Sequence, residues 1–145
     1  QFLLFPAYEH QKKELLKSQY HKDLDCVLQS YDAKNPQIKI SYFARLYEDV
    51  EIKSEEKLCS LENDHICTNQ FAFERFKWKI NQPLHLLFLR IYKLQQACTV
   101  PIRDEYLGCK SWFQLPCGVE ESDLTPVLEE DIFLQRVNSI KEKLR

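Results

Sequence analysis

Glycine is scarce in this chain, and its scarcity excludes two classes of nucleotide-binding site. The 145 residues include only two glycines, Gly108 and Gly118. The P-loop and the dinucleotide-binding fingerprint both need several glycines at short spacing, so that the backbone can approach a phosphate. The sequence therefore predicts neither kind of phosphate-binding loop.

The chain also lacks long apolar runs and an excess of positive charge. A transmembrane helix needs about 20 consecutive apolar residues, and the apolar runs here are only a few residues long. The 20 basic and 22 acidic residues give a net charge of −2 and an isoelectric point near 6.1. Generic polyanion binders usually have isoelectric points above about 9. We therefore expect a cytoplasmic protein with no membrane partner.

The cysteine pattern lacks the C-x-x-C pair that nucleates a zinc ribbon. Six cysteines are present, at positions 26, 59, 67, 98, 109 and 117. A chain of this length buries roughly two thirds of its unfolded surface and needs no disulfide or metal to fold. His65 and Cys67, with Cys59 nearby, would supply three zinc ligands, but the sequence indicates no fourth. We expect reduced, mostly buried cysteines, no metal and no cofactor.

Hydrophobic periodicity predicts a mixture of strands and helices. Strands are expected at 2–5, 38–52, 84–94, 99–102 and 110–115, helices at 9–17, 23–28, 55–61, 69–79 and 129–145, and a turn at 123–126. Ser54 and Thr68 are the candidate N-caps of two of the helices. The near-continuous apolar run at 84–94 favours a central strand covered on both faces.

This order of elements shows no regular βαβ alternation, so it indicates the α+β class. We expect one domain over residues 1–145. Its core would be a small mixed or antiparallel sheet, or a partial barrel, with three or four flanking helices and an amphipathic C-terminal helix. The analogy is with the PUA and ASCH domains.

Four blocks of sequence resemble a known family. They are Phe5-Pro-Ala-Tyr-Glu-His-Gln11, in which Ala7 replaces the family's usual Thr, then Pro83–Leu94, Tyr106–Trp112 and Thr125–Leu128. The chain resembles the bacterial family of domains of unknown function numbered 1802. The resemblance implies no established activity and an association with restriction–modification systems. Family members usually carry an earlier segment with an L-R-K-G-G motif, so we expect this chain to lack the N-terminal part of its domain.

Two clusters could carry catalysis. Glu9 and His10 stand together just after the first strand, where an imidazole and a carboxylate could perform acid–base chemistry. Glu51 and Lys53 form a Glu-x-Lys at a strand end, which is half of the motif of many metal-dependent nucleases. The structural alternative for Glu9 and His10 is the first turn of a helix. The structural alternative for Glu51 and Lys53 is a charged strand end exposed to solvent.

Cations and aromatics interleave over residues 71–93, where five cations face only Glu74. The cations of such a segment can bind phosphates, and its aromatic rings can stack on bases. A helix that exposes its basic residues to solvent and buries its aromatic residues in the core gives the same pattern. The candidate ligand-binding residues are Tyr8, His10, Gln11, Arg75, Arg90, Tyr92, Arg103, Tyr106, Lys110 and Trp112. Arg90 lies within an apolar strand and must find a partner, either a carboxylate such as Glu48 or Glu105 or an anionic ligand. Gly108 is expected to take a positive φ.

Three functions remain open at this point. The first is a nucleic-acid-associated binding module linked to restriction–modification or defence. The second is an enzyme, either a metal-dependent nuclease or a His-based hydrolase. The third is a protein-interaction domain without catalysis. The partner would be nucleic acid or another protein, and the sequence does not predict an oligomeric state.

Overall fold

One antiparallel sheet organises the molecule in the computed structural model. The model describes residues 1–8, 11–32, 34–78, 82–106, 108 and 110–145. Its strands are β1 (Phe2–Leu3), β2 (Gln37–Ile52), β3 (Leu84–Pro101) and β4 (Leu124–Pro126), in the spatial order β1-β2-β3-β4. Each neighbouring pair is antiparallel. The sheet is open, with β1 and β4 at its edges, and together with four α-helices it confirms the predicted α+β class.

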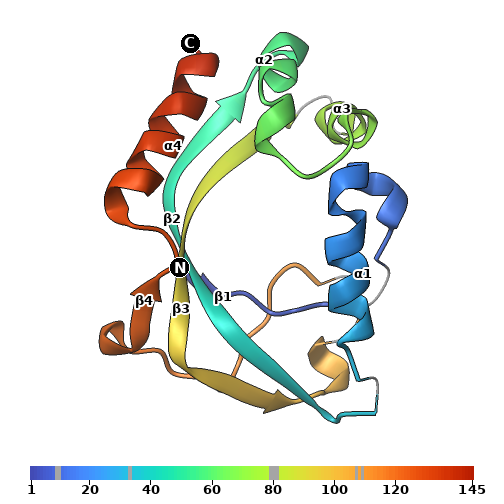
Figure 1. Ribbon diagram of the computed structural model, residues 1–145, viewed down its shortest axis with the longest axis vertical. Coiled ribbons are helices and arrows are strands. Elements are labelled where there is room, and N and C mark those ends of the chain that lie inside the picture. The colour runs from blue at the N-terminus through green and yellow to red at the C-terminus, as the bar shows by residue number, and fades with distance from the viewer. Residues whose placement is uncertain (9–10, 33, 79–81, 107, 109) are drawn as a thin grey trace.

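The long pair β2–β3 runs the length of the molecule and curves strongly (Figure 1). Its register runs from Gln37 opposite Pro101 to Ile52 opposite Leu84, with irregularities at 40–42 and 46–48. Such irregularities bend and twist a strand pair. β3 is longer than predicted, because the expected strand at 99–102 merges into it. It is central, but Leu87 is 47% exposed, so the expectation that both faces are covered is wrong at this end.

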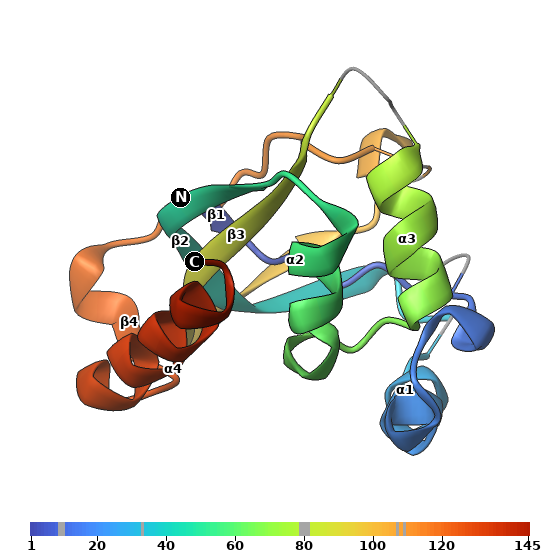
Figure 2. The same ribbon diagram turned by 90° about the horizontal axis from the view of Figure 1, so that it is seen from above.

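The four helices are α1 (His21–Gln29), α2 (Glu55–Ser60), α3 (Asn69–Lys77) and α4 (Glu130–Lys143). α4 lies on one side of the long strand pair, whereas α1 and α3 lie on the other (Figures 1 and 2). Both predicted N-caps are confirmed. The Ser54 hydroxyl accepts a hydrogen bond from the Lys57 amide, and the Thr68 hydroxyl accepts one from the Phe71 amide.

Three sequence predictions of local structure are wrong. Over 9–17, the described residues form only a short 3₁₀ turn at Lys13–Leu15, because Leu16 pairs with Cys67 in an isolated β-bridge. Residues 110–115 form no strand, since Phe113 and Leu115 pack on the core without a neighbouring strand to pair with. The expected turn at 123–126 instead contains the edge strand β4, which pairs with Tyr92–Leu94.

The core has two parts, one at each end of the β2–β3 pair. At the Gln37–Pro101 end, Ile38, Ile40, Val100 and Tyr106 form one buried cluster. At the Ile52–Leu84 end, two adjoining clusters bring α2, α3 and α4 onto the sheet. Arg90 occupies the stretch of β3 between these two ends.

The cysteines differ from the sequence prediction. Cys98 and Cys117 form a disulfide, and Cys26 and Cys59 are exposed free thiols. The pairing is possible because both half-cystines pack against the same apolar cluster, one from β3 and one from the segment that follows it. Cys109 lies outside the described residues. No helix in the described part of the chain is long and apolar enough to cross a membrane.

Candidate functional site

Arg90 is the one buried charged residue in the described part of the chain, with 6% of its surface exposed. Its Nη2 atom forms an ion pair with Oε2 of Glu130 in α4, at 3.1 Å. Its guanidinium also lies 4.8 Å from the centroid of the Phe133 ring. The sequence named Glu48, Glu105 or an anion as possible partners. Glu48 pairs with Lys141 and Glu105 with Arg103, so the carboxylate that pairs with Arg90 is Glu130. The alternative of an anionic ligand stays a prediction.

A second arginine, Arg45, lies directly opposite Arg90 in the β2–β3 register. Its Nη2 atom pairs with Glu121 at 2.5 Å, and both guanidinium groups approach the ring of Tyr92, at 5.2 and 5.9 Å. Like charges directly opposite one another destabilise a sheet. Two carboxylates and the negative face of one aromatic ring offset that repulsion here. We call Arg45, Arg90, Tyr92, Glu121 and Glu130 the arginine centre.

Three guanidinium nitrogens of the arginine centre are buried without a hydrogen-bond partner. They are Nε of Arg45 together with Nε and Nη1 of Arg90. Buried donors without partners are costly in any fold. Aromatic faces partly compensate the two cations, but they do not replace the missing hydrogen bonds.

One N-terminal candidate, Tyr8, lines a polar cavity of about 380 Å³. Tyr8 stacks on Tyr31, with ring centroids 4.2 Å apart, and both rings line this cavity. Gln11 donates from its side-chain amide to the carbonyl of Ala7. Glu9 and His10 lie outside the described residues, so their proposed acid–base role stays a prediction.

The nuclease hypothesis rests on Glu51 and Lys53, and the two carboxylates that precede them on β2 are engaged elsewhere. Glu48 accepts two hydrogen bonds from Lys141 of α4, at 2.8 and 2.9 Å. Asp49 accepts one from Nδ1 of His85 at 2.7 Å. Glu51 and Lys53 are exposed. Across the described ranges, no three His, Cys, Asp or Glu side chains lie together in a way that could hold a metal ion.

The candidates after β3 form a separate group that does not meet Arg90. Arg103 pairs with Glu105 at 3.2 Å, and Lys110 donates to the Glu105 carbonyl at 2.9 Å. Tyr106 is buried in the core, and Trp112 is 71% exposed. Gly108 has a φ of +86°, which confirms the predicted left-handed backbone.

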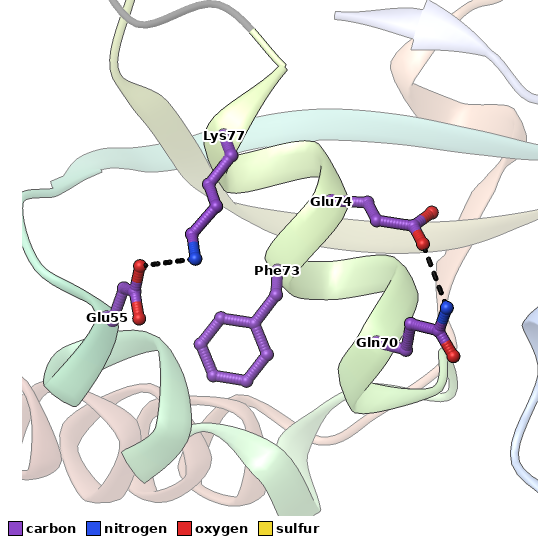
Figure 3. Close-up of a pocket in the computed structure, with 5 residues that line it drawn as sticks. All are labelled: Glu55, Gln70, Phe73, Glu74 and Lys77. Atoms are coloured by element: carbon purple, nitrogen blue, oxygen red, sulfur yellow. Dashed lines mark hydrogen bonds and ion pairs between the residues drawn. The ribbon is translucent and has the colours of Figure 1, made fainter.

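The basic residues of α3 split between two of its faces. On one face, Lys77 pairs with Glu55 at 2.9 Å, beside an open groove of about 580 Å³ (Figure 3). Figure 3 shows the Phe73 ring pointing into this groove and Glu74 bonded to Gln70. With two carboxylates and one ammonium, the groove does not favour an anion. On the other face, Arg75 stacks on Trp78, which is 69% exposed.

Among the titratable groups of the described residues, His65 has the one clear perturbation of its pKa. Burial lowers the pKa of its imidazole below the ordinary value of 6.5, and the neighbouring Lys17 ammonium lowers it further. A hydrogen bond with the Cys67 backbone and the negative charges of Asp64 and Glu62 raise this pKa, but their effect is outweighed. Its Nδ1 atom is buried without a hydrogen-bond partner. His65 is therefore a neutral imidazole at pH 7.

Sequence reasoning missed Arg45, Glu130 and the His85–Asp49 pair. Each depends on the β2–β3 register or on the docking of α4, and neither has a local sequence signal. The alternation of both strands could have suggested their pairing. The long connection between them, residues 53–83, leaves the register free, and a shift of one residue would separate Arg45 from Arg90.

Arg90 gives the first testable prediction. Arg90→Ala should lower the free energy of unfolding by about 2–3 kcal/mol, because it leaves a void beside Phe133 and Tyr92. Arg90→Met should stay within about 1 kcal/mol of the wild type, because it fills similar volume and removes two unpartnered donors. Urea unfolding measures both changes, with the exposed Arg103→Ala as control. Equal destabilisation by the Ala and Met variants would show that the charge itself is indispensable.

His65 gives a prediction about pH. Because its pKa is lower in the folded than in the unfolded chain, the unfolded state binds more protons as the pH falls below about 6.5. His65 should therefore contribute stability that is complete above pH 6.5 and declines below it. Urea unfolding between pH 5 and 8 should show a shallower decline for His65→Asn than for wild type. An unchanged slope in His65→Asn would contradict the assignment.

Comparison with known proteins agrees with the resemblance seen in the sequence. Residues 1–139 match the family described as Domain of unknown function (DUF1802). No curated protein and no solved structure matches the chain. The family match covers the whole sheet, the arginine centre and the first ten of the 14 residues of α4, and on that basis the chain belongs to the DUF1802 family.

Proposed function

We propose that this protein is a nucleic-acid-associated binding module that recognises single strands at the C-terminal end of α3. We further propose that it acts in the bacterial cytoplasm alongside restriction–modification or defence systems, as the family resemblance implies.

The observation that carries this proposal is the pairing of Arg75 with Trp78. The guanidinium carbon lies 5.3 Å from the indole centroid. The indole itself is 69% exposed. Large exposed aromatics are stacking platforms for unpaired bases, and a neighbouring arginine adds charge and a second planar face. Single strands fit best, because their bases are free to stack.

The charge around Trp78 supports the same proposal. Lys77 precedes it, and Lys79 follows it in the sequence but lies outside the described residues. The Lys77–Glu55 pair is a surface pair with side chains 63% and 51% exposed. Such pairs are weak, so Glu55 offsets the positive charge of Lys77 only in part.

The arginine centre supports a polyanion less well. Arg90 is buried. Both arginines of the arginine centre already pair with glutamates whose side chains are largely exposed. Glu129 and Asp131 flank Glu130 in the sequence and add further negative charge there. A phosphate backbone would be repelled by these groups before it reached either guanidinium.

Fluorescence anisotropy with a labelled oligothymidine tests the proposal. Trp78→Ala should weaken binding about tenfold, because stacking of one base on an aromatic side chain is worth about 1–3 kcal/mol. Arg75→Gln should weaken binding and reduce the dependence of log K on log salt by about one.

Trp112→Ala is the matched control, because Trp112 is also about 70% exposed but lies outside α3. It should leave the affinity unchanged within about twofold, an interval small beside one base-stacking contact. Loss of binding in Trp112→Ala with retention in Trp78→Ala would move the site to the 106–112 segment. Absence of binding at low salt would refute the nucleic-acid proposal.

A further inference from the structure

A mostly apolar cavity lies between the Ile52–Leu84 end of the sheet and helices α2, α3 and α4. Its volume is about 350 Å³, at the lower end of the range of small-molecule sites. Eight of its twelve lining residues are apolar, among them Ile52, Leu61, Phe71 and Leu86. Size and lining together suit a compound of one or two rings.

Four polar side chains also line the cavity: Asp64, His65, Cys67 and His85. Nδ1 of His65 is buried and has no hydrogen-bond partner. Buried polar atoms in proteins are nearly always paired, so an unpaired one calls for an explanation. A hydrogen bond from a ligand in the cavity would supply the missing partner.

The charges around the cavity favour an uncharged ligand. No lysine or arginine belongs to its lining, and Asp64 is already paired with Lys143 at 2.7 Å. His85 holds Asp49 through Nδ1, which leaves its Nε2 atom as the ring nitrogen available to a ligand. The side chain of His85 is 46% exposed, so it marks the solvent side of the cavity.

We propose that this cavity binds a small uncharged heteroaromatic molecule, which stacks on Phe71 and hydrogen-bonds to His65. The neutral state of the His65 imidazole at pH 7 agrees with such a ligand, because it adds no charge to an apolar site. The proposal is independent of the nucleic-acid surface, since neither Arg75 nor Trp78 lines the cavity.

Titration of the ¹⁵N-labelled full chain with adenine, benzimidazole and benzoate at pH 7.5 tests this site. Adenine or benzimidazole should shift the amide signals of residues 64–67, 71–72 and 84–86, whereas benzoate should not. Binding of neither heterocycle at its solubility limit would overturn the proposal. Equal binding of benzoate would overturn the preference for an uncharged ligand.

Two variants separate binding from folding. His65→Ala should weaken the bound heterocycle at least tenfold, and His65→Asn should recover part of the loss, because its amide can still form a hydrogen bond. Phe71→Leu keeps the lining of the cavity apolar but removes the aromatic ring. It should weaken binding of the heterocycle about fivefold, because it removes the stacking contact. His21→Asn, outside the lining, is the control. Wild-type affinity in both His65→Ala and Phe71→Leu would contradict the proposed contacts.

Discussion

A guanidinium buried in the middle of the long strand pair is the constraint around which the rest of this structure is arranged. Arg90 lies between the two parts of the core and is 6% exposed. A buried charge is costly unless an opposite charge lies beside it. Glu130 supplies the carboxylate and Phe133 the aromatic face, and both belong to α4. The demand of one strand residue for a partner therefore helps to set where the C-terminal helix docks.

This arrangement also separates structural arginines from those that could bind a ligand. The cations of residues 71–93 do not form one surface in the folded chain. Arg90 is buried inside the molecule, whereas Arg75 lies beside the exposed Trp78. The arginine centre is close to neutral, because each guanidinium faces a glutamate. Recognition of an anion is thus better placed at the end of α3, where the partners of the cations are weak or aromatic.

Much of the fold could be predicted from local signals. Three signals each determine structure within a few residues of where they stand. They are the alternation at 38–52, the caps Ser54 and Thr68, and the spacing of apolar residues in the C-terminal helix. The predicted helix at 9–17 failed because Leu16 instead pairs with Cys67, a partner 51 positions away. The apolar residues of the segment 110–115 predict a strand. A strand also needs a neighbouring strand to pair with, and local sequence does not show whether one is present.

The candidate site was less predictable than the fold, for the same reason. Arg90 could be singled out from the sequence because a cation within an apolar strand is unusual. The apolar residues on either side of it in the strand also predict its burial. Its partners could not be inferred, because Arg45 depends on the register across a long connection and Glu130 on the docking of α4. His65 carries no sequence signal for burial, since the residues around it are largely polar and lie in a connection between α2 and α3.

A double-mutant cycle between Arg90 and Glu130 tests the central claim most directly. Glu130→Gln should cost at least about 1 kcal/mol more in the Arg90 chain than in an Arg90→Met chain, because only the former leaves a buried cation unpaired. The loss of a negative charge from the first turn of α4 is common to both backgrounds and cancels in the difference. Equal costs in the two backgrounds would show that Glu130 does not stabilise Arg90, and would contradict the role of this pair in docking α4.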